Sequence, residues 1–285
     1  MEIGIGLPNP VPGTQGRTLI EWARRAEERG FTGLATIDRI AYPSYESIVA
    51  LAAAAAATDR IGLLTNVLLG PTRNPVLLAK EAATLDQLSG GRLTLGLGVG
   101  ARPDDFEAVG LDFATRGKRW DDDLELIHRA WRGELVAGAL RPVGPTPVNG
   151  ERVPILIGGM GDKAIERTVK WGIGWTVGGA PPERGGPFAE RVRAAWRDAG
   201  RAGAPKIVGL TYFGLSDDAA DRARRYLVDY YGDFGEGIAE FIPKDPRALK
   251  ETVAKFADHG FDELYLDPTT NDLGEVDRAA DALLA

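Results

Sequence analysis

Cysteine is absent from this chain of 285 residues. Without thiols, the protein can form no disulfide bond, no thiolate nucleophile and no cysteine-ligated metal site. Histidine is almost absent too. Both histidines, His128 and His259, fall in helical patterns away from the expected strand ends. We therefore predict no metal site and a cytoplasmic location.

Long apolar runs and an excess of positive charge are also missing. The longest apolar run, residues 48–57, is mostly alanine and too short to span a bilayer. Met1 leads directly into EIGIGLP, which is typical of a strand rather than a signal peptide. The net charge is -7, with Lys and Arg scattered among acidic residues. We expect a small-molecule substrate, with no membrane or nucleic-acid partner.

What the sequence does contain is a regular alternation of short aliphatic runs and helical patterns. The aliphatic runs predict strands at 2–8, 33–37, 60–67, 92–98, 154–158, 174–178, 206–214 and 263–268. The helical patterns cover 18–29, 48–58, 75–88, 121–132, 163–171, 187–200, 217–231, 246–258 and a segment from 275. Eight such units predict a (β/α)₈ TIM barrel in one domain, residues 1–285.

Two connections are longer than a barrel needs. Residues 101–120 and 135–153 exceed the usual length of a connection between a strand and a helix. We interpret both as loop insertions at the C-terminal face of the barrel, where such enzymes build their sites.

The segment from Gly96 to Ala101 fits the glycine pattern of a dinucleotide-binding turn. That turn belongs to the first strand of a Rossmann unit and needs an acidic residue about 20 positions later. Here three strand–helix units come first, and the following RWDDDLELIHRAW is helical in period. The glycines are therefore better explained as the carboxyl end of a barrel strand.

Glycine recurs at the carboxyl ends of four neighbouring strands, the third to the sixth. A bare surface of this kind would let a flat ring or a phosphate approach the backbone, although an ordinary tight turn explains any single glycine. Residues 158–161 precede a helix, whose free N–H groups would suit an anion. An Asp162 cap at the same helix start is an equally good explanation.

Several motifs together resemble one family. They are Asn74-Pro75, the run LLAKEAATLDQLSGGRLTLGLGVG at 77–100, Arg116, DLELIHRAW, and the final LYLDPTTNDLGEVDRAADAL. Over nearly the whole chain they resemble the bacterial luciferase-like family of flavin- and deazaflavin-dependent oxidoreductases. The resemblance implies a barrel whose C-terminal mouth holds the cofactor ring, a non-proline cis peptide at Asn66-Val67 behind the ring, and a homodimer.

The resemblance also implies a set of cofactor-binding positions. At two of them this chain departs from family patterns: Arg39 replaces a frequent histidine, and Ala101-Arg102 replaces a glutamate of sugar-phosphate-oxidising relatives, which argues against that substrate. For Asp38, a turn cap paired with Arg39 is an alternative. The implied cofactor-binding residues are Leu7, Asp38, Arg39, Asn66, Val67, Gly98, Gly100, Ala101, Arg102, Gly158, Gly159 and Met160.

Candidate catalytic and substrate residues lie at the same strand ends. Asp38, Tyr212 and Asp104 are available as an acid or base, and we select Asp38 and Tyr212. Aromatic side chains including Trp175, Tyr212 and Phe213 are candidates for an apolar substrate wall, with the protein core as the alternative. Tyr230 and Tyr231 precede the glycine-rich GDFGEG, which is consistent with a mobile lid.

Two cofactors remain open at this point. The short chain, and an Arg-rich composition typical of GC-rich genomes, favour the deazaflavin coenzyme F420 (8-hydroxy-5-deazaflavin). We predict an oxidoreductase that transfers a hydride between F420 and a small organic substrate. An FMN-dependent monooxygenase and a non-catalytic flavin-binding barrel are the alternatives.

Overall fold

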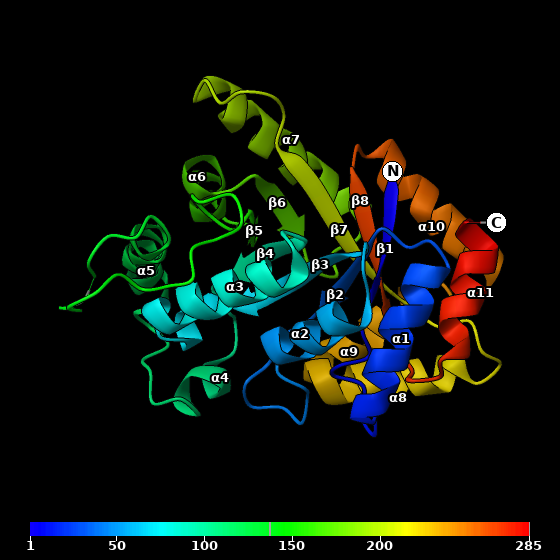
Figure 1. The fold of residues 1–285 in the computed structure, drawn as a ribbon. Coiled ribbons are helices and arrows are strands. Elements are labelled where there is room, and N and C mark those ends of the chain that lie inside the picture. The colour runs from blue at the N-terminus through cyan, green and yellow to red at the C-terminus, as the bar shows by residue number, and fades with distance from the viewer. Residues whose placement is uncertain (137, 285) are drawn as a thin grey trace.

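Eight parallel strands close into a barrel in the computed structural model, which describes residues 1–136 and 138–284 (Figure 1). β1 pairs with both β2 and β8, which joins the two ends of the sheet. The strands are β1 Glu2–Gly6, β2 Gly33–Thr36, β3 Gly62–Leu69, β4 Leu93–Gly98, β5 Ile155–Gly158, β6 Gly174–Val177, β7 Lys206–Phe213 and β8 Glu263–Pro268. The predicted barrel is confirmed.

Helices follow the strands and cover the outside of the barrel (Figure 1). They are α1 Gly16–Glu28, α2 Ser47–Ala57, α3 Pro75–Ser89, α4 Pro103–Glu107, α5 Arg116–Trp131, α6 Asp162–Trp171, α7 Pro182–Asp198, α8 Ala219–Tyr231, α9 Gly235–Phe241, α10 Pro246–Asp258 and α11 Gly274–Leu283, with 3₁₀ turns η1 Gly70–Thr72 and η2 Gly232–Phe234. Among the described residues, no helix is both long and apolar enough to cross a membrane.

Side chains alternate between the inside of the barrel and the helix layer, as the period of a strand requires. The interior cluster takes one residue from each of several strands: Ala35, Leu64, Leu156, Val208 and Tyr265. The alternate residues of the strands pack beneath the helices in a separate, larger core. This alternation decides which side chain at each strand end faces the barrel axis.

Local signals in the sequence set the ends of α3. The side chain of Asn74 accepts hydrogen bonds from the backbone N–H groups of Val76 and Leu77, both at 3.0 Å, and Pro75 occupies the first turn. Gly90 ends the helix with φ of 68°, a left-handed conformation that favours glycine.

The two long connections lie in different places. Residues 101–120 contain α4 and follow β4, so they lie at the C-terminal face as predicted. The described part of residues 135–153 does not lie at that face. In this segment the carbonyl of Gly144 accepts from Lys80 at 3.0 Å and the N–H of Val148 donates to Asp86 at 2.7 Å, so it runs along the outside of α3. The prediction of a second insertion at the mouth was wrong because this segment precedes a strand.

Some helix boundaries differ from the sequence prediction. α7 begins at Pro182 rather than Pro187, because Gly185 and Gly186 pack tightly against Phe261 and His259 and hold these poor helix formers in place. α5 begins at Arg116, five residues before its predicted start at 121. α9 was not predicted, and with α8 it covers one side of the barrel mouth (Figure 1).

Candidate functional site

A cavity of about 390 Å³ opens at the carboxyl ends of the strands, and we call it the mouth cavity. Segments far apart in the sequence meet there because parallel strands of a closed barrel end on the same face. It is lined by Ile37, Asp38, Arg39, Asn66, Val67, Leu69, Gly98, Val99, Gly100, Ala101, Arg102, Asp105, Gly158, Gly159, Met160, Val177, Gly178, Leu210, Tyr212, Tyr230 and Tyr231.

Val67 lies between two glycines in this cavity. A Cβ atom added to Gly98 would come within 2.7 Å of the Val67 side chain, and one added to Gly158 within 2.9 Å. The Asn66-Val67 peptide is cis, as predicted, and the pairing of β3 with β4 shifts register between Thr65 and Leu68. The bare strand ends thus make room for Val67, and Val67 itself offers an apolar surface to a ligand.

Asn66 presents a polar atom that lacks a partner. Its Oδ1 accepts a 2.7 Å hydrogen bond from the hydroxyl of Thr176. This bond orients the amide, whose Nδ2 is buried and finds no acceptor among the described residues. A buried donor without a partner costs about 1–3 kcal/mol. A ligand with carbonyl or ring-nitrogen acceptors above Val67 would remove that cost, so the residues present fit a flavin or deazaflavin ring.

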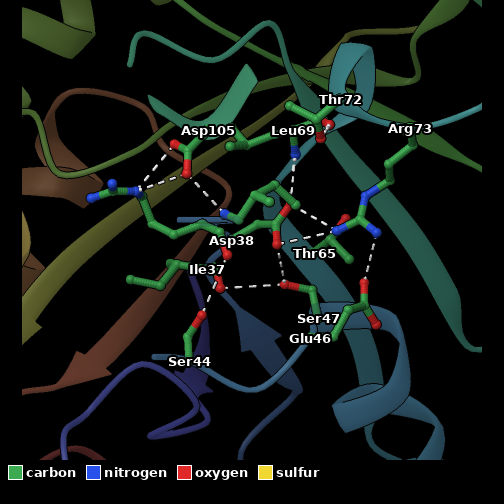
Figure 2. A network of polar contacts seen from close by, with 12 residues as sticks. Ile37, Asp38, Ser44, Glu46, Ser47, Thr65, Leu69, Thr72, Arg73 and Asp105 are labelled. Atoms are coloured by element: carbon green, nitrogen blue, oxygen red, sulfur yellow. Dashed lines mark hydrogen bonds and ion pairs between the residues drawn. The ribbon is translucent and has the colours of Figure 1, made fainter. Parts of the chain in front are cut away.

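Asp38 lies on the cavity wall, and Figure 2 shows that its carboxylate is already engaged. Arg73 donates to both of its oxygens, at 3.2 and 3.0 Å, and the backbone N–H of Leu69 donates at 3.0 Å. Ser47 adds a longer contact of 3.4 Å. Asp38 therefore links the end of β2 to the end of β3, and its role as an acid or base stays a prediction.

Arg39 does not pair with Asp38, which corrects the alternative drawn from the sequence. Its guanidinium lies 2.7 Å from Asp104 and 3.1 Å from Asp105. Asp105 also accepts the backbone N–H groups of Ile40 and Ala41 at 2.9 and 2.8 Å. The segment after β4 is thereby fixed to the segment after β2, so Asp104 is an ion-pair partner of Arg39 in this site.

Three tyrosines, Tyr212, Tyr230 and Tyr231, form one side of the cavity, which we call the tyrosine wall. The hydroxyls of Tyr212 and Tyr231 are 2.7 Å apart. Burial raises the pKa of Tyr212 well above that of a free phenol, and the neighbouring Tyr231 and Tyr226 act in the same direction. Burial also raises the pKa of Tyr231, although its hydrogen bond with Tyr212 acts in the opposite direction.

Three predicted site residues do not line the cavity. Trp175 and Phe213 are fully buried in the core between the strands and the helices, and Leu7 is buried there too. Alternation along the strand is the reason: Tyr212 faces the barrel axis, so the next residue, Phe213, faces outward. Trp175 still touches the site, because its indole N–H donates to the carbonyl of Gly159 at 2.7 Å.

Among the described residues, no side chain caps the backbone N–H groups at the start of α6, beside the cavity. Gly161 is the N-cap of α6 and provides no side-chain cap, so the Asp162 cap considered from the sequence is not formed. Asp162 instead forms an exposed ion pair with Arg191 at 2.5 Å. Gly158, Gly159 and Met160 line the cavity at this helix start.

The histidines lie outside the site. His128 is buried on α5 against Trp171, with ring centroids 4.5 Å apart, and His259 follows α10. Across residues 1–136 and 138–284, no group of three or more His, Cys, Asp or Glu side chains could hold a metal ion.

A second cavity of about 740 Å³ adjoins the tyrosine wall, and we call it the side cavity. It shares Leu210 and Tyr212 with the mouth cavity. Most of its other lining is apolar: Ala180, Pro181, Pro182, Phe234, Ile238, Phe241, Ile242 and Phe256.

Sequence reasoning missed several residues that shape the site. Arg73 was not singled out, although it lies in a polar Thr-Arg-Asn turn after a predicted strand, and only the fold brings it to Asp38. Thr176 was missed because inward polar residues of a buried strand carry no local signal. Val177 and Leu210 had no signal beyond their place near a strand end.

Comparison with known proteins agrees with this architecture. The family model described as luciferase-like monooxygenase matches residues 1–284. An uncharacterized protein of Mycobacterium tuberculosis is 30% identical over 230 residues, which cover 71% of this chain and 80% of that protein.

Two solved structures share the fold. The monooxygenase RslO1 from Streptomyces bottropensis superposes with a TM-score of 0.83 at 22% identity, covering 100% of this chain and 99% of its own. An F420-dependent secondary alcohol dehydrogenase, in complex with an F420-acetone adduct, gives a TM-score of 0.79 at 17% identity and covers 99% and 98%.

Proposed function

The chain belongs to the luciferase-like monooxygenase family, and on that premise we propose that it is an oxidoreductase that binds coenzyme F420 in the mouth cavity. In this proposal it transfers a hydride between F420 and a small organic substrate. The observation that carries the proposal is the unpartnered, buried Nδ2 of Asn66 beside the apolar surface of Val67. Together they suit one face and one polar edge of a tricyclic ring.

Each element of the cavity has a role in this proposal. Val67 supports the ring from behind, and Asn66, oriented by Thr176, donates to a ring acceptor. Free backbone N–H groups at the start of α6 suit the cofactor phosphate. Bound there, the deazaflavin supplies a ring carbon that gives or accepts a hydride. The protein positions the substrate against that carbon and excludes water.

An FMN-dependent monooxygenase is the second candidate. It is favoured by the likeness to the monooxygenase RslO1, which matches this chain over nearly its whole length. Because RslO1 is a monooxygenase of nearly the same length as this chain, chain length does not distinguish the two candidates. The likeness to an F420-dependent alcohol dehydrogenase supports the first candidate equally well at the level of the fold.

Cofactor titration tests the proposal. Purified protein is titrated separately with F420 and with FMN while tryptophan emission is followed, because Trp175 is hydrogen-bonded directly to the cavity-lining Gly159. We expect saturable quenching with F420 and weaker binding of FMN, followed by hydride transfer from reduced F420 to an added carbonyl or unsaturated acceptor. Tighter binding of FMN would favour the second candidate, and binding of neither cofactor would contradict both.

A variant of Asn66 tests the assigned contact. Asn66→Leu removes the donor and should weaken cofactor binding about tenfold, the value of one buried hydrogen bond. Asn149→Leu, at an exposed asparagine outside the cavity, is the matched control. Equal affinities of the two variants would remove Asn66 from the cofactor site.

A further inference from the structure

Arg102 stands out among the charged residues of the mouth cavity. Among the described residues it forms no ion pair, and its Nη1 is buried without a hydrogen-bond acceptor. The guanidinium lies over the rings of Tyr230 and Tyr231, at 5.0 and 5.2 Å from their centroids. Ring faces attract a cation, but they do not replace an anionic acceptor. None of the described residues therefore provides an anionic partner for Arg102.

The acidic groups around Arg102 are already used. Asp38 is paired with Arg73, and both Asp104 and Asp105 are paired with Arg39. Asp229 accepts a 2.6 Å hydrogen bond from Tyr42. Asp267 lies inside the barrel, where burial raises its pKa and so favours the uncharged acid. The positive charge of Arg102 is left for a ligand to neutralise.

The hydroxyl groups of Tyr212 and Tyr231 line the same cavity as the Arg102 guanidinium. In the Tyr212–Tyr231 pair, one O–H is used in their mutual 2.7 Å hydrogen bond. The second O–H has no acceptor among residues 1–136 and 138–284. Burial keeps both phenols protonated, so they act as donors and do not themselves supply an anion to Arg102.

We propose that Arg102 and the Tyr212–Tyr231 pair form a subsite for a negatively charged oxygen of the substrate. The substrate class that fits is a flat aromatic compound with an ionised phenol or enol. Its ring would pack against the tyrosine wall, and its apolar remainder would extend past Tyr212 into the side cavity. This assignment rests on the proposed function, because it treats the bound oxygen as part of the substrate.

A chromogenic phenol tests the subsite directly. 4-Nitrophenol absorbs at longer wavelength as the anion, so its spectrum reports the ionisation state of the bound probe without any turnover. We expect the wild-type protein to bind the anion and to lower the apparent pKa of the bound probe. Nitrobenzene, which lacks the ionisable oxygen, should bind without dependence on Arg102.

Substitution of Arg102 should remove this preference. Arg102→Met is expected to weaken binding of the anion about tenfold to hundredfold, since a hydrogen bond to a charged group is lost. Arg197→Met, an exposed arginine of α7, is the control for the change in net charge. If Arg102→Met does not fold, Arg102→Lys keeps the charge and loses the planar guanidinium, and weaker anion binding is again expected.

The hydroxyl pair is tested separately. Tyr231→Phe should weaken binding of the anion by about fivefold. Tyr226→Phe should not, because the Tyr226 hydroxyl has no hydrogen-bond partner among the described residues and Tyr226 does not line the cavity. Binding of the neutral phenol alone, or equal affinity of the Arg102 variants and the wild type, would overturn the subsite.

A comparison of FMN with riboflavin distinguishes the source of the anion. If Arg102→Met weakens FMN binding but leaves riboflavin and nitrophenolate unchanged, Arg102 binds a cofactor phosphate and the assignment to substrate is overturned. If Arg102→Met weakens binding of F420 and nitrophenolate but not of FMN, Arg102 binds the ring hydroxyl oxygen of the deazaflavin, and the assignment to substrate is again overturned. Titrations with F420 and FMN on the same preparations separate the two proposals. If the protein binds cofactor but its binding of nitrophenolate does not depend on Arg102, the subsite alone is overturned. If it binds nitrophenolate in an Arg102-dependent way but binds neither cofactor, the subsite is supported and the proposed function is contradicted.

Discussion

Arg73 places its Nη2 atom 3.0 Å from Oδ2 of Asp38, and this ion pair joins the turn after β3 to the end of β2. The Asp38 side chain is 2% exposed and that of Arg73 is 15% exposed, so water screens the pair poorly. Asp38 also holds the backbone N–H of Leu69 at 3.0 Å. The pair therefore fixes the wall of the mouth cavity rather than providing a free carboxylate.

Arg73→Met should destabilise the protein strongly. It leaves a buried carboxylate without its cation, and such a change costs about 3–5 kcal/mol in the free energy of unfolding. Unfolding in urea measures the loss. In the double variant Asp38→Asn with Arg73→Met, the buried charge of Asp38 is gone and only the partly exposed Glu46, which Arg73 also pairs at 2.9 Å, is left without its cation. The double variant should therefore be more stable than Arg73→Met alone.

An exposed ion pair provides the control for Arg73. Arg17 pairs with Glu21 at 3.0 Å, and their side chains are 87% and 46% exposed. Arg17→Met should change the free energy of unfolding by about 1 kcal/mol or less. A loss as small as this for Arg73→Met would show that the buried pair does not carry the stability assigned to it.

Gly158→Ala tests the packing of Val67. The new Cβ would lie 2.9 Å from Val67 and force it to move, with an expected cost of about 1–3 kcal/mol and weaker cofactor binding. Val67→Ala combined with Gly158→Ala should recover stability, because the smaller side chain leaves room. Gly178→Ala, whose Cβ would meet nothing within 4 Å, is the control for stability only, because Gly178 itself lines the mouth cavity. If the double variant does not recover stability, the loss caused by Gly158→Ala does not come from contact with Val67.

The barrel could be predicted from the sequence because its signals are local and repeat. Each strand is a short aliphatic run, and caps such as Asn74 and Gly90 mark where α3 begins and ends. α9 and the early start of α7 were not predictable in this way. In α7, tertiary contacts of Gly185 and Gly186 override poor helix propensity. In α9, Gly235 packs closely against the backbone of Leu227 and Val228 in α8.

The candidate site was predictable in its location but only partly in its contacts. Glycines at neighbouring strand ends indicated the cavity, yet the structure shows that Gly98 and Gly158 accommodate Val67. The family resemblance, not periodicity, predicted the cis peptide at Asn66-Val67, which is confirmed. Pairs such as Asp38 with Arg73 join residues 35 positions apart, and no spacing rule reveals them.

Trp175 should report on cofactor binding without taking part in it. Its indole lies outside the strand layer and reaches the site through the Gly159 carbonyl, so Trp175→Phe should remove most of the quenching by a bound flavin or deazaflavin. Affinity measured by equilibrium dialysis should change less than about tenfold, because one backbone hydrogen bond is lost. Trp196→Phe, on α7, is the control. If quenching is unchanged in Trp175→Phe, the cofactor ring does not bind beside Gly159 in the mouth cavity.

Asp267→Asn tests a buried carboxyl that opposes folding at neutral pH. Burial raises the pKa of Asp267 well above its ordinary value of 3.8, and its Oδ1 has no partner among the described residues. The folded state therefore binds a proton more tightly than the unfolded chain. Its contribution to stability is complete below about pH 4 and is lost as the pH rises toward the folded pKa.

Asparagine carries no charge at any of these pH values, so the variant should gain stability relative to the wild type as the pH increases above about 4. Urea unfolding across a pH series measures this difference, with the exposed Asp233→Asn as the control. A stability difference that does not change with pH would mean that Asp267 is ionised in the folded protein. The Asp267 carboxylate would then be an anion near the tyrosine wall. It could balance the positive charge of Arg102, which would then need no anionic ligand.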